Sequence, residues 1–346
     1  MFEQTAVPPP VDRTESQTRP GAPSGLPGDA GRDPANPASR RDNWSASALT
    51  VAVAAFGRLP LRCARALGAV LGLLVFLGSP RYRRKLVTNL MQAGLDGGGR
   101  RWRAAMQAGQ ALAEMPFVWT RSGDEIAARV RTEGYERIAV LQEQGVGILF
   151  LTPHLGAFDL AARHFGNTAP ITVMFRPPRL RALEPVLYQS RNNAQRSAVP
   201  ANLAGVRAMI RALRAGQAVG LLPDQVPLAG HGRWAPFFGR PAFTMTLPAR
   251  LAGAARLKVL LAVAERVKGG WKLRIEPLEA DPQPEVLNAA MEALIRSCPD
   301  QYLWGYSRYR SPPGAEPPGI PSSGCEASGS CQSPAPAADR SIGGAS

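Results

Sequence analysis

The stretch GILFLTPHLGAFDLAARHFG, residues 147–166, decides the fold prediction for this chain of 346 residues. It begins with a short, continuously apolar run, which is typical of a strand that is covered on both faces of its sheet. Thr152 and Pro153 end the run, and a helix is expected to begin near Asp159. A strand followed by a turn and a helix is the repeating unit of an α/β fold.

The same alternation continues along the chain. Strands are predicted at residues 147–152, 171–176, 218–224, 258–266 and 271–278, and helices at residues 102–121, 134–143, 182–194 and 203–216. Gly216 is a typical stop signal for the last of these helices. The pattern predicts an α/β fold in which a central, largely parallel sheet is flanked by helices.

Polar residues stand at the ends of three predicted strands. These are His154 with Asp159, then Arg176, and then Asp224 with Gln225. Ligands of such sheets bind at the carboxyl ends of the strands. The five residues are therefore candidate site residues.

His154 and Asp159 form a candidate catalytic pair. Five residues along a regular helix turn by about 500°, so the two side chains would point ~140° apart if both lay within it. They meet only if His154 lies in the preceding loop, which Pro153 and Gly156 favour. A neutral imidazole can then take a proton from a hydroxyl group while a carboxylate fixes its tautomer. The alternative is a histidine that binds the backbone at a helix start.

Other nucleophilic and metal-binding residue types form no comparable pattern. No serine or cysteine stands in a G-x-S-x-G context, so direct transfer to an external hydroxyl group is expected rather than a covalent enzyme intermediate. The four cysteines have neither metal-site nor disulfide spacing, which favours a reducing, cytoplasmic setting without a metal. His164 and His231 are expected to be structural.

Composition and charge divide the chain. Residues 1–46 and 311–346 are rich in Pro, Gly, Ser and Ala and are predicted to be disordered tails. Both tails carry more acidic than basic residues, so the net charge of +15 belongs to the middle of the chain. A strongly basic folded part indicates an anionic partner.

The middle of the chain is predicted to hold a membrane-associated helical segment, residues 47–85, and a catalytic domain, residues 86–310. Residues 66–80 carry no charge, and residues 81–85 include four basic side chains. The uncharged run is shorter than the ~20 residues that span a bilayer. A helix lying at or dipping into an anionic membrane is expected. The alternatives are a buried helix of a soluble core and a single span beginning near Leu49.

Several motifs together resemble a known family. HLGAFD at residues 154–159 resembles the H-x4-D motif of the lysophospholipid acyltransferase-like enzymes. Four further segments resemble one branch, the late lipid A acyltransferases, which are lauroyl and myristoyl transferases of Gram-negative bacteria: MFRPPRL (174–180), GQAVGLLPDQVP (216–227), WAPFFGRPAFTMTLPARLA (234–252) and CPDQYLWGYSRYR (298–310). The resemblance covers residues 48–310. Tyr306 departs from it, because many members carry a histidine at this position.

The resemblance implies transfer of a fatty acyl chain from acyl carrier protein to a hydroxyl group of a lipid A precursor. The reaction would take place at the cytoplasmic face of the bacterial inner membrane, without a metal or other cofactor. His154 would deprotonate the acceptor hydroxyl group and Asp159 would orient the imidazole. Arg176 would bind phosphate or developing negative charge, or pair with an acid such as Asp224.

The remaining residues of the motifs have less specific expectations. Gln225 would hydrogen-bond the acceptor or simply belong to a turn. PFFGRPA, residues 236–242, would be a loop that shapes the acyl tunnel, with Arg240 near a head group; Phe237 and Phe238 could equally be core. The aromatic and basic residues of QYLWGYSRYR, 301–310, are expected to form an interfacial belt.

Two alternative functions fit part of these observations. An acyltransferase acting on a glycerophospholipid, glycolipid or ornithine lipid would share the same motifs. A nucleic-acid-binding protein would explain the basic charge. However, the sequence has no helix-turn-helix, zinc-knuckle or RNP signature, and the apolar helix has no place in such a protein.

Overall fold

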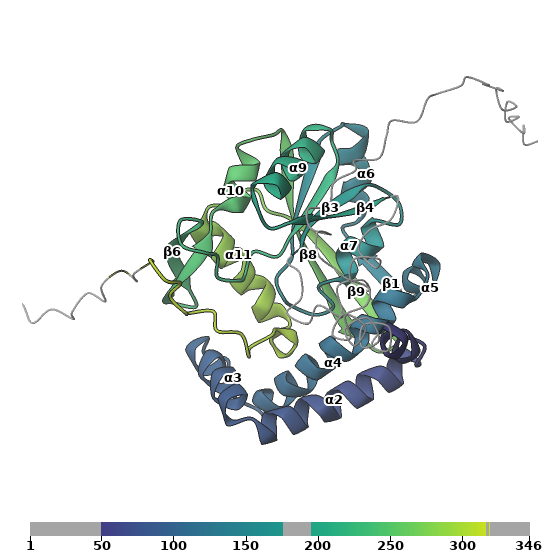
Figure 1. Cartoon of the computed structure of the whole chain (residues 1–346), viewed down its shortest axis with the longest axis vertical. Helices are drawn as coiled ribbons and strands as arrows, with labels where there is room; N and C mark the ends of the chain where they lie inside the picture. Colours follow the sequence, from purple (N-terminus) through teal and green to yellow (C-terminus); the bar gives the residue numbers. More distant parts are fainter. Residues whose placement is uncertain (1–49, 176–194, 316–317, 319–346) are drawn as a thin grey trace, which may run out of the picture. The chain divides into compact units, whose positions relative to one another are not determined.

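The computed structural model describes residues 50–175, 195–315 and 318, and its centre is a seven-stranded sheet (Figure 1). The strand order is β1-β9-β8-β2-β5-β3-β4. The strands are β1 (Val130–Glu133), β2 (Gly147–Leu151), β3 (Ile171–Phe175), β4 (Arg196–Pro200), β5 (Ala218–Leu221), β8 (Leu257–Val267) and β9 (Gly270–Pro277). Neighbouring strands are parallel except β8 and β9, which are antiparallel. The prediction of an α/β fold with a largely parallel sheet is confirmed.

Helices cover both faces of the sheet (Figure 1). They are α2 (Leu61–Gly78), α3 (Pro80–Gln92), α4 (Arg100–Thr120), α5 (Gly123–Ala127), α6 (Glu136–Glu143), α7 (Leu160–Phe165), α9 (Leu203–Arg214), α10 (Leu247–Ala252) and α11 (Pro284–Ser297). Side chains of β2 alternate between two buried clusters: Leu149 and Leu151 join one, and Ile148 and Phe150 join the other. Burial on both faces explains why this strand is continuously apolar.

Within the described residues, the five strands predicted from the sequence are present together with four that were not predicted. Predicted helices are confirmed at α4, α6 and α9, with Gly216 in the left-handed conformation at φ 71° after α9. The helix predicted at residues 182–194 lies outside the described residues. Of the strands that were missed, β1 has the sequence VRTE and is mostly exposed, so it lacks an apolar run.

The segment PFFGRPA forms a β-hairpin rather than the loop that the sequence predicted. Strands β6 (Gly232–Phe237) and β7 (Arg240–Met245) pair antiparallel and are joined at Phe238 and Gly239. Both joining residues have positive φ, 47° and 73°. Phe237 and Phe238 are buried in the larger core cluster. The core alternative for these two phenylalanines is therefore the right one.

The segment predicted to meet the membrane contains α2 and α3, preceded by helical residues 50–57. Helix α2 is long and apolar enough to cross a bilayer, judged by its length and composition alone, and only 22% of it is buried. One face packs inward, while large apolar side chains on the opposite face are exposed. These exposed side chains are Leu67, Val70, Leu71, Leu74, Val75 and Leu77.

Close contact between α2 and α4 depends on small residues (Figure 1). A Cβ atom on Gly72 would collide with the carbonyl oxygen of Ala105, and one on Gly109 with that of Gly68. The backbones therefore approach as closely as glycine allows.

A buried carboxylate joins this pair of helices to the sheet. Glu114 of α4 is 1% exposed and accepts from Arg65 Nε at 2.9 Å and Arg266 Nη1 at 3.0 Å. It also accepts from Trp271 Nε1 at 3.2 Å. Arg65 belongs to α2 and Arg266 to β8. Because an unpaired buried charge is costly, the cluster fixes α2 relative to the β8–β9 hairpin.

We predict that Gly72→Ala destabilises the protein by about 1–3 kcal/mol, because the added methyl group forces the backbones of α2 and α4 apart. Gly78→Ala, in the same helix, is the matched control: its Cβ meets nothing within 4 Å, so it should be neutral or slightly stabilising. Thermal unfolding in detergent would measure both. Equal melting temperatures for the two variants would contradict this account of the helix interface.

Candidate active site

His154 lies in the loop between β2 and α7, as the sequence predicted. Gly156 has φ 62°, and a Cβ there would collide with the carbonyl oxygen of Ala264. Hydrogen bonds hold the loop on two sides: Ala157 N donates to Ala264 O at 2.8 Å, and Gly156 N donates to Gln301 O at 3.2 Å. Glycine is thus needed where the loop passes closely over β8.

The imidazole of His154 is bound at both nitrogens by residues that follow the neighbouring strand β5. Asp224 Oδ1 lies 2.7 Å from Nδ1, and Asp224 Oδ2 accepts from the main-chain N–H of His154 at 2.8 Å. Gln225 Nε2 lies 3.0 Å from Nε2. Since an ionised carboxylate can only accept, we assign the ring proton to Nδ1 and the lone pair to Nε2, where the Gln225 amide donates.

Asp224 remains a carboxylate in spite of its burial. Its side chain is 2% exposed, and desolvation alone would raise its pKa. Attraction to the His154 ring when it is protonated, the two hydrogen bonds from His154 and the charge of Arg308 outweigh this effect, so the pKa of Asp224 lies below its ordinary value. A carboxylate held in this way fixes the tautomer of the imidazole and stabilises an imidazolium.

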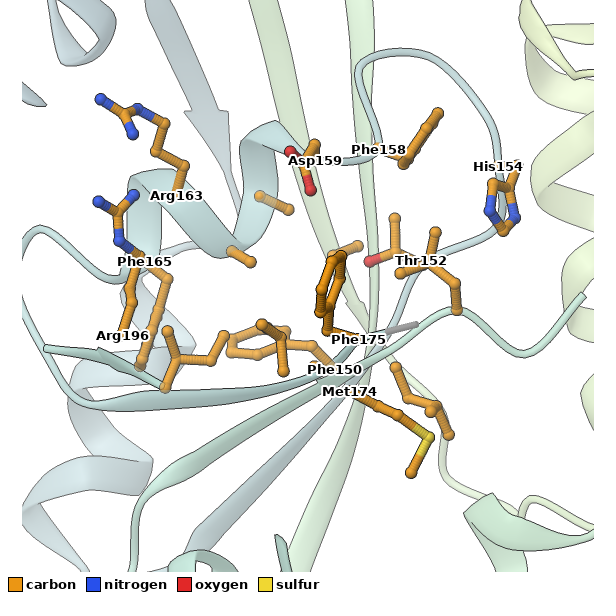
Figure 2. A pocket seen from close by; sticks show the side chains of 18 of the residues that line it. Phe150, Thr152, His154, Phe158, Asp159, Arg163, Phe165, Met174, Phe175 and Arg196 are labelled. Atoms are coloured by element: carbon orange, nitrogen blue, oxygen red, sulfur yellow. The ribbon is translucent and has the colours of Figure 1, made fainter. Parts of the chain in front are cut away.

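Asp159 does not occupy the position against the imidazole that the sequence predicted for it. Its Oδ2 accepts from Trp119 Nε1 at 2.6 Å, and it interacts electrostatically with Arg163 and Arg196. Figure 2 shows Phe158 between Asp159 and His154. The Nδ1 contact belongs to Asp224 instead, because β2 and β5 are neighbours and their carboxyl ends lie side by side. Any catalytic role of Asp159 stays a prediction.

His154, Gln225 and Asp159 line one cavity of about 280 Å³ (Figure 2). Most of its wall is apolar and comes from the sheet and α7, including Phe150, Phe165, Ile171, Val173 and Ile275. Arg163 and Arg196 line it as well. Burial and the neighbouring charge of Arg196 lower the pKa of Arg163 to about 10, against the opposing effect of Asp159. The cavity is thus an apolar chamber with a histidine in its wall and cationic side chains elsewhere.

The other predicted site residues lie apart from this arrangement. Arg176 lies outside the described residues. Arg240 begins β7, with its guanidinium carbon 4.8 Å from the centre of the Tyr309 ring. Within the part of the chain that the structure describes, the cavity lining does not include Arg240. Its binding role stays a prediction.

Three aromatic and basic side chains of the C-terminal motif are buried and Arg310 is exposed, so the motif is not the continuous interfacial belt that the sequence predicted. Tyr302, Trp304 and Arg308 are 4%, 2% and 2% exposed. Arg308 donates to Phe243 O, Thr244 Oγ1 and Asn288 Oδ1 at 2.7–3.1 Å, which ties the motif to β7 and α11. Aromatic and basic side chains suit an interface in composition, but here they meet partners from distant parts of the chain.

Sequence reasoning also missed Trp119, Arg163 and Arg196. Trp119 lies in α4 and Arg196 begins β4, so neither stands beside a recognised motif. Arg163 follows the H-x4-D segment by four residues, and helical spacing from Asp159 was the signal available for it. Across the described ranges, no group of three His, Cys, Asp or Glu side chains is placed to hold a metal ion.

The α/β fold and the ordered motifs describe an acyltransferase, and comparison with known proteins gives its family. Residues 39–311 match the family of bacterial lipid A biosynthesis acyltransferases, and the chain belongs to this family. It is 28% identical over 218 residues to the lipid A biosynthesis palmitoleoyltransferase of Escherichia coli (strain K12), covering 60% of this chain and 70% of that protein.

Two further relatives come from the same organism. The lipid A biosynthesis lauroyltransferase is 28% identical over 228 residues, which cover 62% of this chain and 71% of the relative. The lipid A biosynthesis myristoyltransferase is 27% identical over 212 residues, which cover 57% of this chain and 64% of the relative. The resemblance noted in the motifs is therefore confirmed at the level of the family.

Proposed function

We propose that this protein transfers a fatty acyl chain from acyl carrier protein to a hydroxyl group of a lipid A precursor, with His154 as the general base. The observation that carries the proposal is the environment of His154. Its Nδ1 is bound to the buried carboxylate of Asp224, and its Nε2 lone pair stands at the wall of an apolar cavity. Family membership favours lipid A as the acceptor over other lipids or nucleic acid.

The proposed reaction follows from this geometry. The acceptor hydroxyl group displaces the Gln225 amide from Nε2 and gives its proton to the imidazole as its oxygen attacks the thioester carbonyl carbon. Asp224 stabilises the imidazolium. When the carbon–sulfur bond breaks, the leaving thiolate takes the proton back, and His154 is neutral again. Gln225, freed from Nε2, can donate to the acceptor oxygen.

The cavity supports a lipid substrate. Its aromatic and aliphatic lining suits a fatty acyl chain, which gains free energy as apolar surface leaves water. Arg163 and Arg196 add positive charge to the wall, and we keep Arg176 as a further candidate for binding phosphate. The orienting function predicted for Asp159 passes to Asp224 in this mechanism. Asp159 instead balances the two arginines.

The donor assignment rests on the family resemblance and on charge. A carrier protein is acidic, and the basic middle of this chain suits such a partner through electrostatic steering. Direct transfer from the thioester is consistent with the absence of a G-x-S-x-G nucleophile motif in the sequence.

The test of this function is acyl transfer by the purified protein to a lipid A precursor, followed by mass spectrometry of the product. The carrier-protein thioester should be a better donor than the acyl-CoA of equal chain length, and its advantage should shrink as salt screens the charges. His154→Ala should lower kcat by about 10²–10⁴-fold, because the proton acceptor is lost.

Three outcomes would each overturn a part of the proposal. Equal efficiency of the two donors would remove the carrier protein. Transfer to a glycerophospholipid but not to the lipid A precursor would change the acceptor. A folded His154→Ala protein that keeps more than a tenth of the parental kcat would remove the general base.

We also propose that the exposed face of α2 binds the cytoplasmic side of the bacterial inner membrane. The exposed apolar side chains form a stripe along α2, and exposed Arg81, Arg84 and Lys85 follow it at the start of α3. Apolar side chains that face the acyl boundary with basic ones at head-group level are typical of membrane-bound helices.

Replacing Leu67, Leu71 and Leu74 together by Gln should reduce binding to anionic lipid vesicles by at least tenfold, because three exposed apolar side chains no longer enter the bilayer. Val140, Leu203 and Leu228 are also large exposed apolar side chains, on other parts of the protein, and their replacement by Gln is the matched control. Vesicle co-sedimentation measures both. A similar loss in the two triple variants would contradict the membrane face.

A further inference from the structure

The segment of residues 301–309, here called the C-terminal strap, runs beside the loop that carries His154. Leu303 N donates to His154 O at 3.2 Å, and Gly156 N donates to Gln301 O at 3.2 Å. Leu155 and Tyr302 form an antiparallel bridge between these contacts. The main chain from His154 to Gly156 is therefore bound to the strap.

The strap also reaches the turn that carries the two partners of the imidazole. Tyr306 Oη accepts from the main-chain N–H of Val226 at 2.9 Å. Asp224 and Gln225 bind His154, so three successive residues of this turn each have a defined contact. Val226 is 2% exposed, and leaving its buried main-chain N–H without an acceptor would cost free energy.

The main chain of the strap around Tyr306 is held in place from outside the cavity. Asn89 of α3 donates to Trp304 O at 2.6 Å and to Tyr306 O at 2.8 Å. Arg308, two residues further along, is fixed by β7 and Asn288. Among the described residues, the cavity lining includes Gln225 and Val226 but not Tyr306. Tyr306 thus touches the turn and not the space for substrate.

We propose that Tyr306 is a positioning residue: its hydroxyl group holds Val226, and thereby keeps the Gln225 amide at Nε2 and the Asp224 carboxylate at Nδ1 of His154. The Tyr306 hydroxyl group is the acceptor for the buried main-chain N–H of Val226, and it can accept only while the turn keeps its present conformation. Without it, the turn reorients to satisfy the amide, and the two contacts on the imidazole change together. The consequence for catalysis rests on the proposed acyl transfer, whereas the consequence for the imidazole does not.

The sequence contains three histidines, which makes the imidazole directly observable. Full-length protein with ¹⁵N-labelled histidine, in detergent, should give ring nitrogen signals that His154→Gln assigns. Tyr306→Phe removes one oxygen atom and should shift the His154 ring signals while those of His164 and His231 stay in place. Tyr309→Phe is the matched control, because its hydroxyl group donates to Phe237 O at 2.9 Å in the same strap but does not reach the turn.

Asn89→Ala provides a second variant that leaves the Tyr306 side chain intact. It removes both hydrogen bonds that hold the strap from α3, and should shift the same His154 signals in the same direction. Unchanged His154 signals in folded Tyr306→Phe would overturn the proposal, and so would equal shifts with Tyr309→Phe. Either result is independent of whether the wild-type protein transfers acyl chains.

Kinetics then test the catalytic consequence. Tyr306→Phe should lower kcat about tenfold with KM changed less than twofold, the loss expected when one buried hydrogen bond fails. Combined with Asp224→Asn and Gln225→Ala together, it should cause little further loss, because Tyr306 acts on His154 only through these two residues. Independent, multiplicative losses would overturn the proposal. A wild-type protein without acyl transfer would instead refute the proposed function.

Discussion

The arrangement of the candidate site depends on one interaction, the paired hydrogen bonds between Asp224 and His154. One carboxylate accepts from the ring and from the main chain of the same residue, at 2.7 and 2.8 Å. Its burial carries a desolvation cost, which these bonds and the charge of Arg308 offset. The imidazole therefore has one orientation and one tautomer, with its Nε2 lone pair accepting from Gln225 at the wall of the cavity.

This interaction requires several distant parts of the chain to be in register. Parallel pairing of β2 and β5 aligns Leu151 with Leu221, so the loops after both strands begin at the same level. Gly156 lets the first loop pass over β8, and the C-terminal strap holds it from the other side. Glu114 links β8 to α2 and thus connects this framework to the apolar helix face. The general base beside the cavity and the proposed membrane-binding face of α2 are therefore both connected to β8.

Local patterns predicted those parts of the fold whose cause is local. Strand β2 was recognisable because both of its faces are buried, and α9 because its spacing and its stop at Gly216 are regular. Strands β1 and β6 are short or partly exposed, so their sequences carry no continuous apolar run. The hairpin of PFFGRPA was missed because its turn uses a phenylalanine at positive φ, which no simple turn rule predicts.

The sequence identified most residues of the site correctly, but it did not predict which of them are in contact. His154, Asp224 and Gln225 were identified from their positions at strand ends, and the fold brings them together. The choice of partner for His154 was wrong, because spacing along the chain favoured Asp159 over a residue seventy positions away. Which of two aspartates meets an imidazole depends on strand order, which local sequence does not encode. The aromatic strap was misjudged for the same reason, since its partners lie in β7, α3 and α11.

The most direct test of this account compares Asp224→Asn with Asp159→Asn in one assay of acyl transfer, with melting curves to establish that both variants fold. If Asp224 orients and stabilises His154, Asp224→Asn should lower kcat by about 10²–10⁴-fold. Asp159→Asn, which keeps a group able to accept from Trp119, should lose far less. A folded Asp224→Asn enzyme with near-parental kcat, beside an inactive Asp159→Asn enzyme, would contradict the account and return the catalytic pairing to the H-x4-D motif.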